Sequence, residues 1–326
     1  MKRIFITGAS GCIGHYITEN LIYNTNHELF LLVRNPAKLQ FDCQARPGIH
    51  ILTGDLAQID KYSDLLLKQI NIAILAATAW GGTAETYDIN VVKTLALIDM
   101  LNPTICEKVI YFSTASILDR NNRLLLAASQ FGHDYIRTKY QCFSQLVQRA
   151  NTGRAIASKI IVLFPTLVFG GDRDKPASHL TAGLPEVIKW MGLIRWLSVD
   201  GSFHFIHAQD IAQIVAFLVE NPNFSLPPAT QTEAIDCLVL GNPAITVDQA
   251  IAEIAAYLNQ RVYFSIPLYI WLANIIIKIF RIQMDAWSRF SLDYRHFTYQ
   301  NPVTPATLGM SNYCSTVAEL MKISHI

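Results

Sequence analysis

The first 165 residues alternate short, nearly continuous apolar runs with longer amphipathic segments, and this alternation constrains the fold more than any other feature. Continuous apolar runs are typical of strands that are covered on both faces. A repeating strand–helix order with right-handed crossovers predicts an α/β fold built on a doubly wound parallel sheet. The expected strands are 3–7, 28–33, 49–53, 70–76, 108–113 and 159–164, and the expected helices are 12–24, 58–68, 84–101 and 132–151.

A glycine-rich turn separates the first expected strand from the first expected helix. Gly8 permits a tight turn, Gly11 lets backbone amides approach a pyrophosphate, and Gly14 lets the helix pack against the strand. An anion would lie at the helix N-terminus, where unpaired N–H groups and the helix dipole favour negative charge. The sequence therefore predicts a dinucleotide site whose contacts are Gly8, Ser10, Gly11, Cys12, Ile13 and Gly14.

The second expected strand ends at Arg34, at the position where an acidic residue would bind the ribose 2′-hydroxyl of NAD. An arginine cannot accept that hydrogen bond, but it can pair with a 2′-phosphate. Lys38, one turn later, would add positive charge. We therefore expect NADP as the cofactor, with NAD as the second choice. The alternative is that Arg34 stacks on the adenine or faces solvent.

Tyr135 and Lys139 form a Y-x-x-x-K pair in an expected helix, so their side chains share one face. The pair follows Thr114, which lies at the end of an apolar strand, where parallel sheets bind ligands. A neighbouring ammonium favours the phenolate, so Lys139 would lower the pKa of Tyr135 and could hold the nicotinamide ribose. We expect Tyr135 to act as the acid or base and Thr114 to orient the substrate oxygen. The alternative is an ordinary surface tyrosine and lysine.

Thr114 is one of three hydroxyl residues in a row of four, with Ser113 and Ser116. Because side chains alternate along a strand, only alternate positions face the site. We prefer Thr114 for the catalytic role.

After residue 165 the rhythm changes, because proline and glycine recur up to residue 185. We expect residues 1–165 to form a dinucleotide-binding domain and residues 166–326 to form a smaller C-terminal substrate lobe, with some late segments returning to the first domain. Within the later part we expect helices at 210–220, 247–258 and 267–281 and a strand at 235–240.

In this order, these motifs resemble the extended short-chain dehydrogenase/reductase family, of the NAD(P)-dependent epimerase/dehydratase type, over nearly the whole chain. The resemblance implies a seven-stranded parallel Rossmann sheet. It also implies that Asp55 holds the adenine amino group, that Asn90 supports the site, and that a loop from Pro165 lies beside the nicotinamide. The cofactor contacts that it adds are Asp55, Leu56, Ala76, Ala77, Asn90, Pro165 and Val168, beside Tyr135 and Lys139. Phe164, Leu118-Asp119 and Gln209 depart from the family pattern, which leaves the substrate open.

Composition excludes several other classes of function. With 26 basic and 25 acidic residues the net charge is +1, so the chain lacks the basic excess of nucleic-acid-binding proteins. The six cysteines and nine histidines form no metal-ligand spacing. No apolar run reaches the roughly 20 residues of a membrane span, and no signal-peptide pattern is present. We therefore expect a cytoplasmic protein without a metal, which could make a weak peripheral membrane contact through 267–281 or form a homodimer.

These features predict an NAD(P)-dependent oxidoreductase that moves hydride between the nicotinamide and a carbonyl or carbinol carbon of a small molecule. The apolar stretch 184–206 favours an apolar substrate, unless it is ordinary core or a dimer face. The first alternative is a nucleotide-sugar epimerase or dehydratase, for whose pyrophosphate Arg173, Lys175, Lys189 and Arg195 are the available cations. The second alternative is a non-catalytic NAD(P)-binding sensor or assembly protein. His204 and His207 are interpreted as structural.

Overall fold

The computed structural model describes residues 1–172, 174–224, 235–271 and 283–324. Seven strands of this described part form one parallel sheet in the order β11-β6-β5-β4-β1-β2-β3. The strands are β1 (Arg3–Thr7), β2 (Glu28–Val33), β3 (Ile49–Thr53), β4 (Ile72–Leu75), β5 (Lys108–Phe112), β6 (Ile160–Pro165) and β11 (Asp236–Leu240). This is the doubly wound Rossmann arrangement that the alternating apolar runs predicted, with strand ends that differ from the expected ones by at most two residues.

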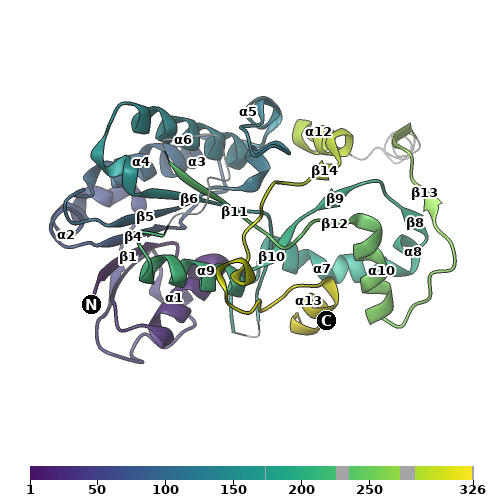
Figure 1. Cartoon of the computed structure of the whole chain (residues 1–326), viewed down its shortest axis with the longest axis horizontal. Helices are drawn as coiled ribbons and strands as arrows, with labels where there is room; N and C mark the ends of the chain where they lie inside the picture. Colours follow the sequence, from purple (N-terminus) through teal and green to yellow (C-terminus); the bar gives the residue numbers. More distant parts are fainter. Residues whose placement is uncertain (173, 225–234, 272–282, 325–326) are drawn as a thin grey trace.

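Helices cover both faces of the sheet, as continuous apolar strands require (Figure 1). One face packs on α1 (Cys12–Asn24) and α9 (Ala208–Glu220). The other face packs on α2 (Ser63–Lys68), α4 (Thr94–Met100) and α6 (Asp134–Asn151). The chain reverses its direction of winding between β1 and β4, which are neighbours in the sheet. In open parallel sheets, ligands bind at the carboxyl ends of the strands at this switch point.

Two of the expected helices are interrupted. The segment expected at 84–101 consists of α3 (Thr83–Tyr87), a π-helical turn (Asp88–Lys93) and α4. Within it, the Thr94 hydroxyl donates to the carbonyl of Ile89, five residues earlier, at 2.8 Å. Hydrophobic periodicity does not reveal such a turn, because the same side chains still face the sheet.

The helix expected at 132–151 is confirmed as α6, and a separate short helix, α5 (Leu126–Phe131), precedes it across Gly132 and His133. A Cβ on Gly132 would lie 2.3 Å from the Ala128 carbonyl, so the break needs a glycine. The helix expected at 58–68 is a 3-10 helix (Leu56–Tyr62) followed by α2.

The later residues form a smaller lobe beside the sheet, in which Met191, Phe205, Ile251 and Leu320 form part of a separate core (Figure 1). Its helices are α7 (His179–Lys189), α8 (Met191–Ile194), α10 (Val247–Tyr257), α12 (Ala286–Tyr294) and α13 (Val317–Ile323). Its short strands are β7 (Leu167–Phe169), β8 (Leu197–Ser198), β9 (Ser202–Phe203), β10 (Phe205–His207), β12 (Ile245–Thr246), β13 (Ile266–Pro267) and β14 (His296–Phe297).

The expected helices 210–220 and 247–258 and the expected strand 235–240 are present as α9, α10 and β11. Two of these, α9 and β11, return to the Rossmann layer. The expected apolar helix 267–281 lies for the most part outside the described residues, which stop at 271 and resume at 283. Its first residue belongs to β13, which pairs with β8.

Candidate active site

The glycine turn between β1 and α1 packs directly on the end of β4. Gly8 has a φ of +81°, and a Cβ there would lie 2.6 Å from the amide nitrogen of Ala77. A Cβ on Gly14 would lie 2.1 Å from the carbonyl oxygen of Gly8. Both glycines are therefore required by close backbone approach, as the sequence predicted. The turn brings Ala76 and Ala77 against the first residues of α1.

The same turn leaves a place for an anion. Gly11 is the N-cap of α1, and no side chain caps the first-turn amides of this helix. The position of a Cβ on Gly11 is open except for the Gly8 carbonyl at 3.4 Å. Uncapped amides at a helix N-terminus, next to a residue without a side chain, fit the pyrophosphate of a dinucleotide. The contacts expected from Ser10 and Ile13, both half-buried in this turn, stay predictions.

Cys12 sits at the first position of α1 and packs against the loop from the lobe. A Cβ on Gly170 would lie 3.0 Å from its sulfur atom. Burial raises the pKa of the Cys12 thiol to about 12, and Asp172 raises it further. Cys12 is therefore a neutral thiol at physiological pH, so it adds no negative charge beside a phosphate.

The residues expected on the adenosine side of the cofactor follow β2 and β3. Arg34 and Lys38 are exposed, and no ion pair holds either of them within the described ranges. Asp55 caps the 3-10 helix that follows it, because its carboxylate accepts a hydrogen bond of 2.8 Å from Ala57. Leu56 is buried beside it. The expected contacts of Asp55, Leu56 and Arg34 with the cofactor stay predictions.

Asn90 braces the site through its whole side-chain amide. Its carbonyl oxygen accepts hydrogen bonds from the Thr78 hydroxyl (3.1 Å) and the Ala79 amide (2.8 Å). Its amide nitrogen donates to the Ala79 carbonyl (3.0 Å) and to the Thr138 hydroxyl (3.1 Å). Asn90 thus ties the loop after β4 to α6. A direct contact between Asn90 and the cofactor stays a prediction.

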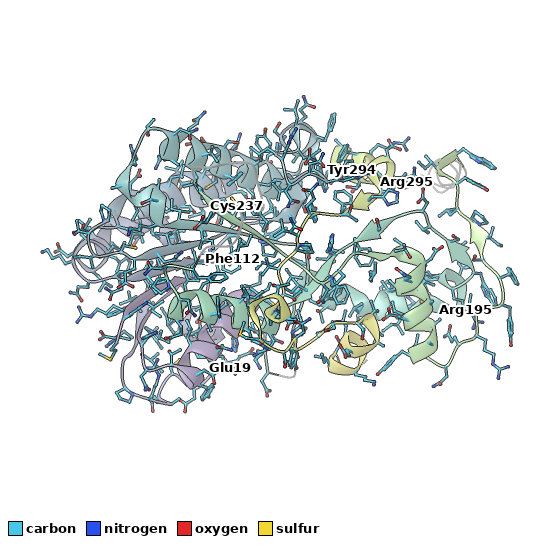
Figure 2. All side chains as sticks on the ribbon, viewed as in Figure 1. Glu19, Phe112, Arg195, Cys237, Tyr294 and Arg295 are labelled. Carbon is cyan, nitrogen blue, oxygen red and sulfur yellow. The ribbon has the colours of Figure 1, made fainter. Side chains whose placement is uncertain are left out.

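Three residues of the expected catalytic set come together where β5 ends and α6 begins. Tyr135 lies in the first turn of α6, and Thr114 is near enough to its hydroxyl to lower the pKa of the phenol. The Thr114 hydroxyl itself donates to the hydroxyl of Ser116 at 3.4 Å. Lys139, one turn later, is buried and donates a 2.7 Å hydrogen bond to the carbonyl of Phe112, the last residue of β5. The Lys139 nitrogen lies 5.9 Å from the centre of the Tyr135 ring. Figure 2 shows Phe112 in the interior of the sheet.

Our expectation that Lys139 lowers the pKa of Tyr135 is not met in this structure. Burial raises the pKa of Tyr135 to about 12, although the nearby Thr114 side chain acts to lower it. Burial also lowers the pKa of Lys139 to about 8. The ammonium donates to the Phe112 carbonyl and lies 5.9 Å from the centre of the Tyr135 ring. At neutral pH the phenol is protonated and most of the Lys139 side chains still carry their charge.

Trp80 is a site residue that sequence reasoning missed. It lies in the loop between β4 and α3, and its ring is stacked on that of Tyr135 with centroids 3.9 Å apart and planes at 11°. The ring of His179, in α7, also contacts Trp80, with ring centroids 4.9 Å apart. Trp80 itself is 53% exposed. One feature of the sequence could have indicated Trp80. It is a tryptophan that follows a strand ending at the switch point, and it directly precedes Gly81-Gly82.

The loop expected beside the nicotinamide crosses from β6 to the lobe. Pro165 ends β6, and Val168 is the central residue of β7, where it pairs with Ile206 of β10. Further along, the Tyr16 hydroxyl accepts hydrogen bonds from the amides of Gly171 (3.1 Å) and Asp172 (3.2 Å). This loop is therefore fixed to α1, the helix that begins at the glycine turn. Cofactor contacts from Pro165 and Val168 stay predictions.

His204 and His207 are structural, as we expected. His204 is buried, with one ring nitrogen 2.7 Å from the carbonyl of Asn242 and the other accepting from the amide of Tyr299 at 3.0 Å. His207 caps α9 by accepting from Gln209, and burial lowers its pKa to about 4. Both rings already have hydrogen-bond partners that hold secondary structure in place.

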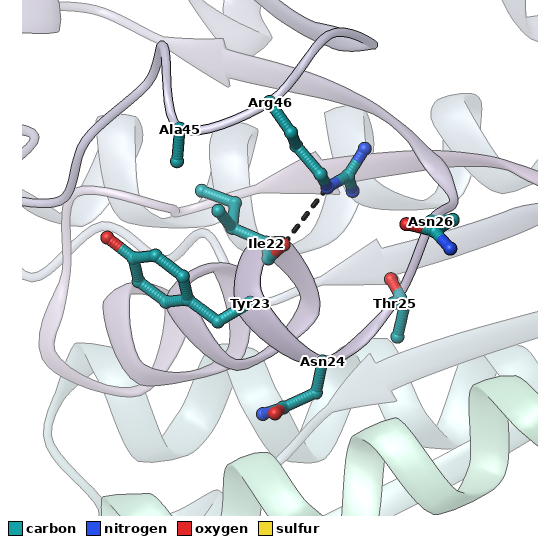
Figure 3. Close-up of a pocket in the computed structure, with 7 residues that line it drawn as sticks. All are labelled: Ile22, Tyr23, Asn24, Thr25, Asn26, Ala45 and Arg46. Atoms are coloured by element: carbon teal, nitrogen blue, oxygen red, sulfur yellow. Dashed lines mark hydrogen bonds between the residues drawn. The ribbon is translucent and has the colours of Figure 1, made fainter.

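A cavity of about 340 Å³ lies at the opposite edge of the sheet, at the C-terminal end of α1 (Figure 3). Arg46 closes one side of it and donates to the carbonyl of Ile22 at 3.0 Å and to that of His27 at 2.6 Å. Because His27 precedes β2, this cavity belongs to the amino edge of the sheet. It is separate from the catalytic residues at the carboxyl edge.

A family model described as the NAD dependent epimerase/dehydratase family matches residues 4–230. The chain belongs to this family. The predicted nicotinamide-dependent enzyme of the extended short-chain dehydrogenase type is thereby confirmed. The search of curated proteins found no match. Within the described ranges, no helix has the length and apolarity needed to cross a membrane, and no group of three or more potential metal ligands occurs.

Solved structures of the same fold include enzymes of nucleotide-sugar chemistry. The chain superposes on a dTDP-glucose 4,6-dehydratase from Bacillus anthracis in complex with NAD, with 12% identity, a TM-score of 0.65 and coverage of 100% of this chain and 96% of that one. A UDP-glucuronic acid 4-epimerase from Bacillus cereus, also bound to NAD, has 16% identity and a TM-score of 0.64, with coverage of 99% of this chain and 98% of that one. A nucleoside-diphosphate-sugar epimerase from Pseudomonas aeruginosa has 14% identity and a TM-score of 0.63, with coverage of 99% of this chain and 96% of that one. At these identities the similarity shows the fold alone.

Proposed function

We propose that this protein is an NADP-dependent oxidoreductase that reduces the carbonyl group of a small, largely apolar molecule, or oxidises the corresponding alcohol. The observation that carries the proposal is that Thr114 lies near enough to Tyr135 to lower the pKa of its hydroxyl, beside the buried Lys139. A protein that only bound a dinucleotide would have no need for an acid held in this way. The sensor or assembly alternative is therefore the less favoured one.

The bound cofactor supplies or accepts a hydride at the reacting carbon. Tyr135 donates its hydroxyl proton to the substrate oxygen during reduction and takes it back during oxidation. Thr114 donates a second hydrogen bond to the same oxygen, which stabilises the negative charge that develops there. Lys139 is buried between β5 and α6 and places a positive charge below the phenol when it is protonated.

The protonation state of the pair favours the reductive direction. With a pKa of about 12, Tyr135 holds its proton throughout the neutral range and acts as an acid. With a pKa of about 8, Lys139 carries its charge mainly below that pH. Carbonyl reduction needs both states, so we expect it to be fastest at neutral or slightly acidic pH.

The positions of the candidate cations support a substrate without a pyrophosphate. Lys175 is held by Glu19 at 3.0 Å and Asp172 at 3.8 Å, beside α1. Lys189 lies 3.4 Å from Glu186, and Arg195 stacks on Trp196 in the outer part of the lobe. Arg173 lies outside the described residues. In contrast, the rings of Trp80 and His133 stack on that of Tyr135.

The second candidate function is epimerisation or dehydration of a nucleotide sugar, which the family match favours. In that reaction the oxidised cofactor would take a hydride from the sugar and later return it, so it would be reduced and then reoxidised within each cycle. The two functions are separated by following NADPH absorbance with a panel of carbonyl compounds and, in parallel, nucleotide-sugar conversion without added cofactor. Stoichiometric NADPH consumption supports the first function. Sugar conversion without net consumption supports the second.

Arg34 is the residue on which the NADP preference rests. It follows β2 at the ribose position and is exposed, so its guanidinium is available to a 2′-phosphate. The test compares the dissociation constants of NADP and NAD for the wild-type protein and for Arg34→Asp. We expect NADP to bind more tightly to the wild type, and the variant to reverse the order. Tighter binding of NAD to the wild type contradicts this part of the proposal.

Tyr135→Phe tests the catalytic assignment. Loss of the proton donor should reduce turnover by about 10²- to 10⁴-fold, the usual contribution of general acid catalysis. The affinity for NADP, measured by calorimetry, should change little, since the aromatic ring remains. Full activity in the variant would overturn the mechanism.

A further inference from the structure

The outer end of the substrate lobe carries large apolar side chains that face solvent. Each of six is more than half exposed, between 52% and 74%. Continuous exposed apolar surface of this kind usually marks an interaction site. We call it the outer aromatic surface, and it consists of Trp190, Leu193, Tyr263, Phe264, Tyr269 and Trp271. The elements next to it, α8, β8 and β13, lie at the end of the lobe farthest from the parallel sheet (Figure 1).

The outer aromatic surface is held together by defined contacts. Trp196 stacks on Phe264 with ring centroids 4.8 Å apart and on Tyr263 at 6.5 Å. The backbone beneath is fixed because β13 pairs with β8 and the amide of Ile266 donates to the carbonyl of Trp196 at 2.7 Å. Tyr269 and Trp271 are nearly coplanar, at 11°. The pairing of β13 with β8 thus holds the residues after Arg261 next to Trp196.

Positive charge is interleaved with these aromatic side chains. The Arg195 guanidinium lies 4.6 Å from the centre of the Trp196 ring and donates to the carbonyl of Arg261 at 3.3 Å. Within the described ranges, neither Arg195 nor Arg261 forms an ion pair with a carboxylate. Figure 2 shows Arg195 at the outer end of the lobe. The indole of Trp190 donates to Glu186 at 2.7 Å, and that carboxylate is paired with Lys189 at 3.4 Å. The surface therefore combines aromatic area with Arg195 and Arg261, which have no carboxylate partner among the described residues.

We propose that the outer aromatic surface docks onto an anionic lipid bilayer. Tryptophan and tyrosine side chains prefer the membrane–water interface, because their rings are amphipathic. Three of the five tryptophans of the chain, Trp190, Trp196 and Trp271, lie at this end. Arg195 and Arg261 are complementary to lipid phosphates, to which their long side chains can extend while the aromatic rings enter the headgroup layer.

The two arginines also argue against a second copy of this chain as the occupant. A two-fold interface buries the same surface of both copies against itself. It would bring Arg195 and Arg261 of one copy towards those of the other, and burial of charges without opposite partners is costly. Glu186, Asp200 and Asp248 also lie near this end, and Glu186 is paired with Lys189 and Asp200 with Arg295. A lipid surface would supply negative charge to the two arginines that are without a carboxylate partner.

The test is co-sedimentation of the full-length protein with phosphatidylcholine vesicles that do or do not contain phosphatidylglycerol. We expect binding to the anionic vesicles that weakens with added salt, and little binding to phosphatidylcholine alone. Tyr263→Ser with Phe264→Ser should reduce the partition coefficient at least about tenfold. Arg195→Gln with Arg261→Gln should reduce it about fivefold per arginine on anionic vesicles only.

The matched control is Tyr23→Ser, which removes an aromatic side chain that is 59% exposed on α1, beside the cavity of Figure 3. It should bind vesicles like the wild type. Equal binding of wild type and Tyr263→Ser with Phe264→Ser overturns the proposal. A second outcome also overturns it. If the wild type is a dimer that does not bind vesicles, and the same double variant is a monomer, then the surface contacts a second copy of the chain.

A measurement on the wild type covers the case in which a double variant does not fold. Vesicles with brominated acyl chains quench indole fluorescence only where the indole reaches the bilayer. We expect strong quenching of the wild type and a much smaller effect in the triple variant Trp190→Phe, Trp196→Phe and Trp271→Phe, which keeps only Trp80 and Trp287 as distant reporters. Absence of quenching in the wild type overturns the proposal.

Discussion

Trp80 lies face to face on Tyr135, with ring centroids 3.9 Å apart and an angle of 11° between the planes. The contact joins the loop after β4 to the first turn of α6. Together with the surrounding burial, it explains why the pKa of the phenol is raised to about 12 while Trp80 itself is half exposed. The indole therefore covers one face of the Tyr135 ring.

Removal of the indole should make Tyr135 more acidic. In Trp80→Ala, water reaches the phenol, and we expect its pKa to fall from about 12 towards the ordinary value of about 10. Absorbance titration of tyrosinate, with the same titration of Tyr135→Phe subtracted, measures the shift. Trp80→Phe keeps an aromatic cover and is the matched control. An unchanged pKa in Trp80→Ala shows that Trp80 is not what shields the phenol.

Lys139 should give the activity of the enzyme an alkaline limit. Burial lowers its pKa to about 8, so its positive charge is lost as the pH rises through that value. We expect kcat/KM for carbonyl reduction to fall above about pH 8 in the wild type. The residual activity of Lys139→Met should not change over the same range, since the titrating group is gone. A wild-type profile that stays level to about pH 9 contradicts this assignment.

Substitutions at two glycines of the glycine turn should affect different quantities: one the stability of the protein, the other its affinity for the cofactor. A methyl group on Gly14 would lie 2.1 Å from the Gly8 carbonyl, so Gly14→Ala should lower the free energy of unfolding by about 1–3 kcal/mol. Gly11 has an ordinary φ of −90° and an open Cβ position. We therefore expect Gly11→Ala to keep its thermal stability but to bind NADP roughly tenfold more weakly, or 1.4 kcal/mol. Thermal melts and calorimetry measure the two quantities, and an unchanged affinity in Gly11→Ala removes the turn from the cofactor site.

Asp210 should stabilise the folded protein more at low pH than at neutral pH, whereas a carboxylate with a lowered pKa does the opposite. Burial raises its pKa to about 6, although the amides of Tyr313 (2.6 Å) and Cys314 (3.1 Å) donate to it. The folded state then holds the proton more tightly than the unfolded state. This contribution to stability is complete below the unfolded pKa of about 3.9 and is lost as the pH rises through about 6.

The measurement is the free energy of unfolding in urea at about pH 6.5 and about pH 4.5 for the wild type and Asp210→Asn. The free energy of unfolding of the wild type, relative to that of the variant, should be larger at the lower pH, by at most about 1.4 kcal/mol per pH unit. The constant effect of the substitution cancels in this comparison. A difference that does not depend on pH shows that Asp210 titrates normally.

The parts of this protein that the sequence predicted well depend on local patterns. The glycine turn, the continuous strands and the i, i+4 relation of Tyr135 and Lys139 are all encoded within a few residues. The meeting of Thr114 with α6 followed from one general property of parallel sheets, namely that consecutive strands end at the same edge.

The features that the sequence did not predict depend on contacts between distant segments. The π-helical turn places Asn90 where its amide can hold Ala79, and this in turn directs Trp80 onto Tyr135. The direction of the Lys139 ammonium depends on the carbonyl of Phe112. Neither geometry follows from periodicity or motif spacing, and both determine the pKa values on which the chemistry depends.

The position of β11 has a consequence for synthesis of the chain. This strand pairs with β6 along its whole length, from Asp236↔Ile161 to Leu240↔Pro165, although some 70 residues separate the two. Until the ribosome has released residue 240, the nascent polypeptide exposes β6 as an apolar, unpaired edge, which is the type of surface that chaperones bind and that aggregates form on. The cell must therefore protect this edge while the intervening part of the lobe is still being made.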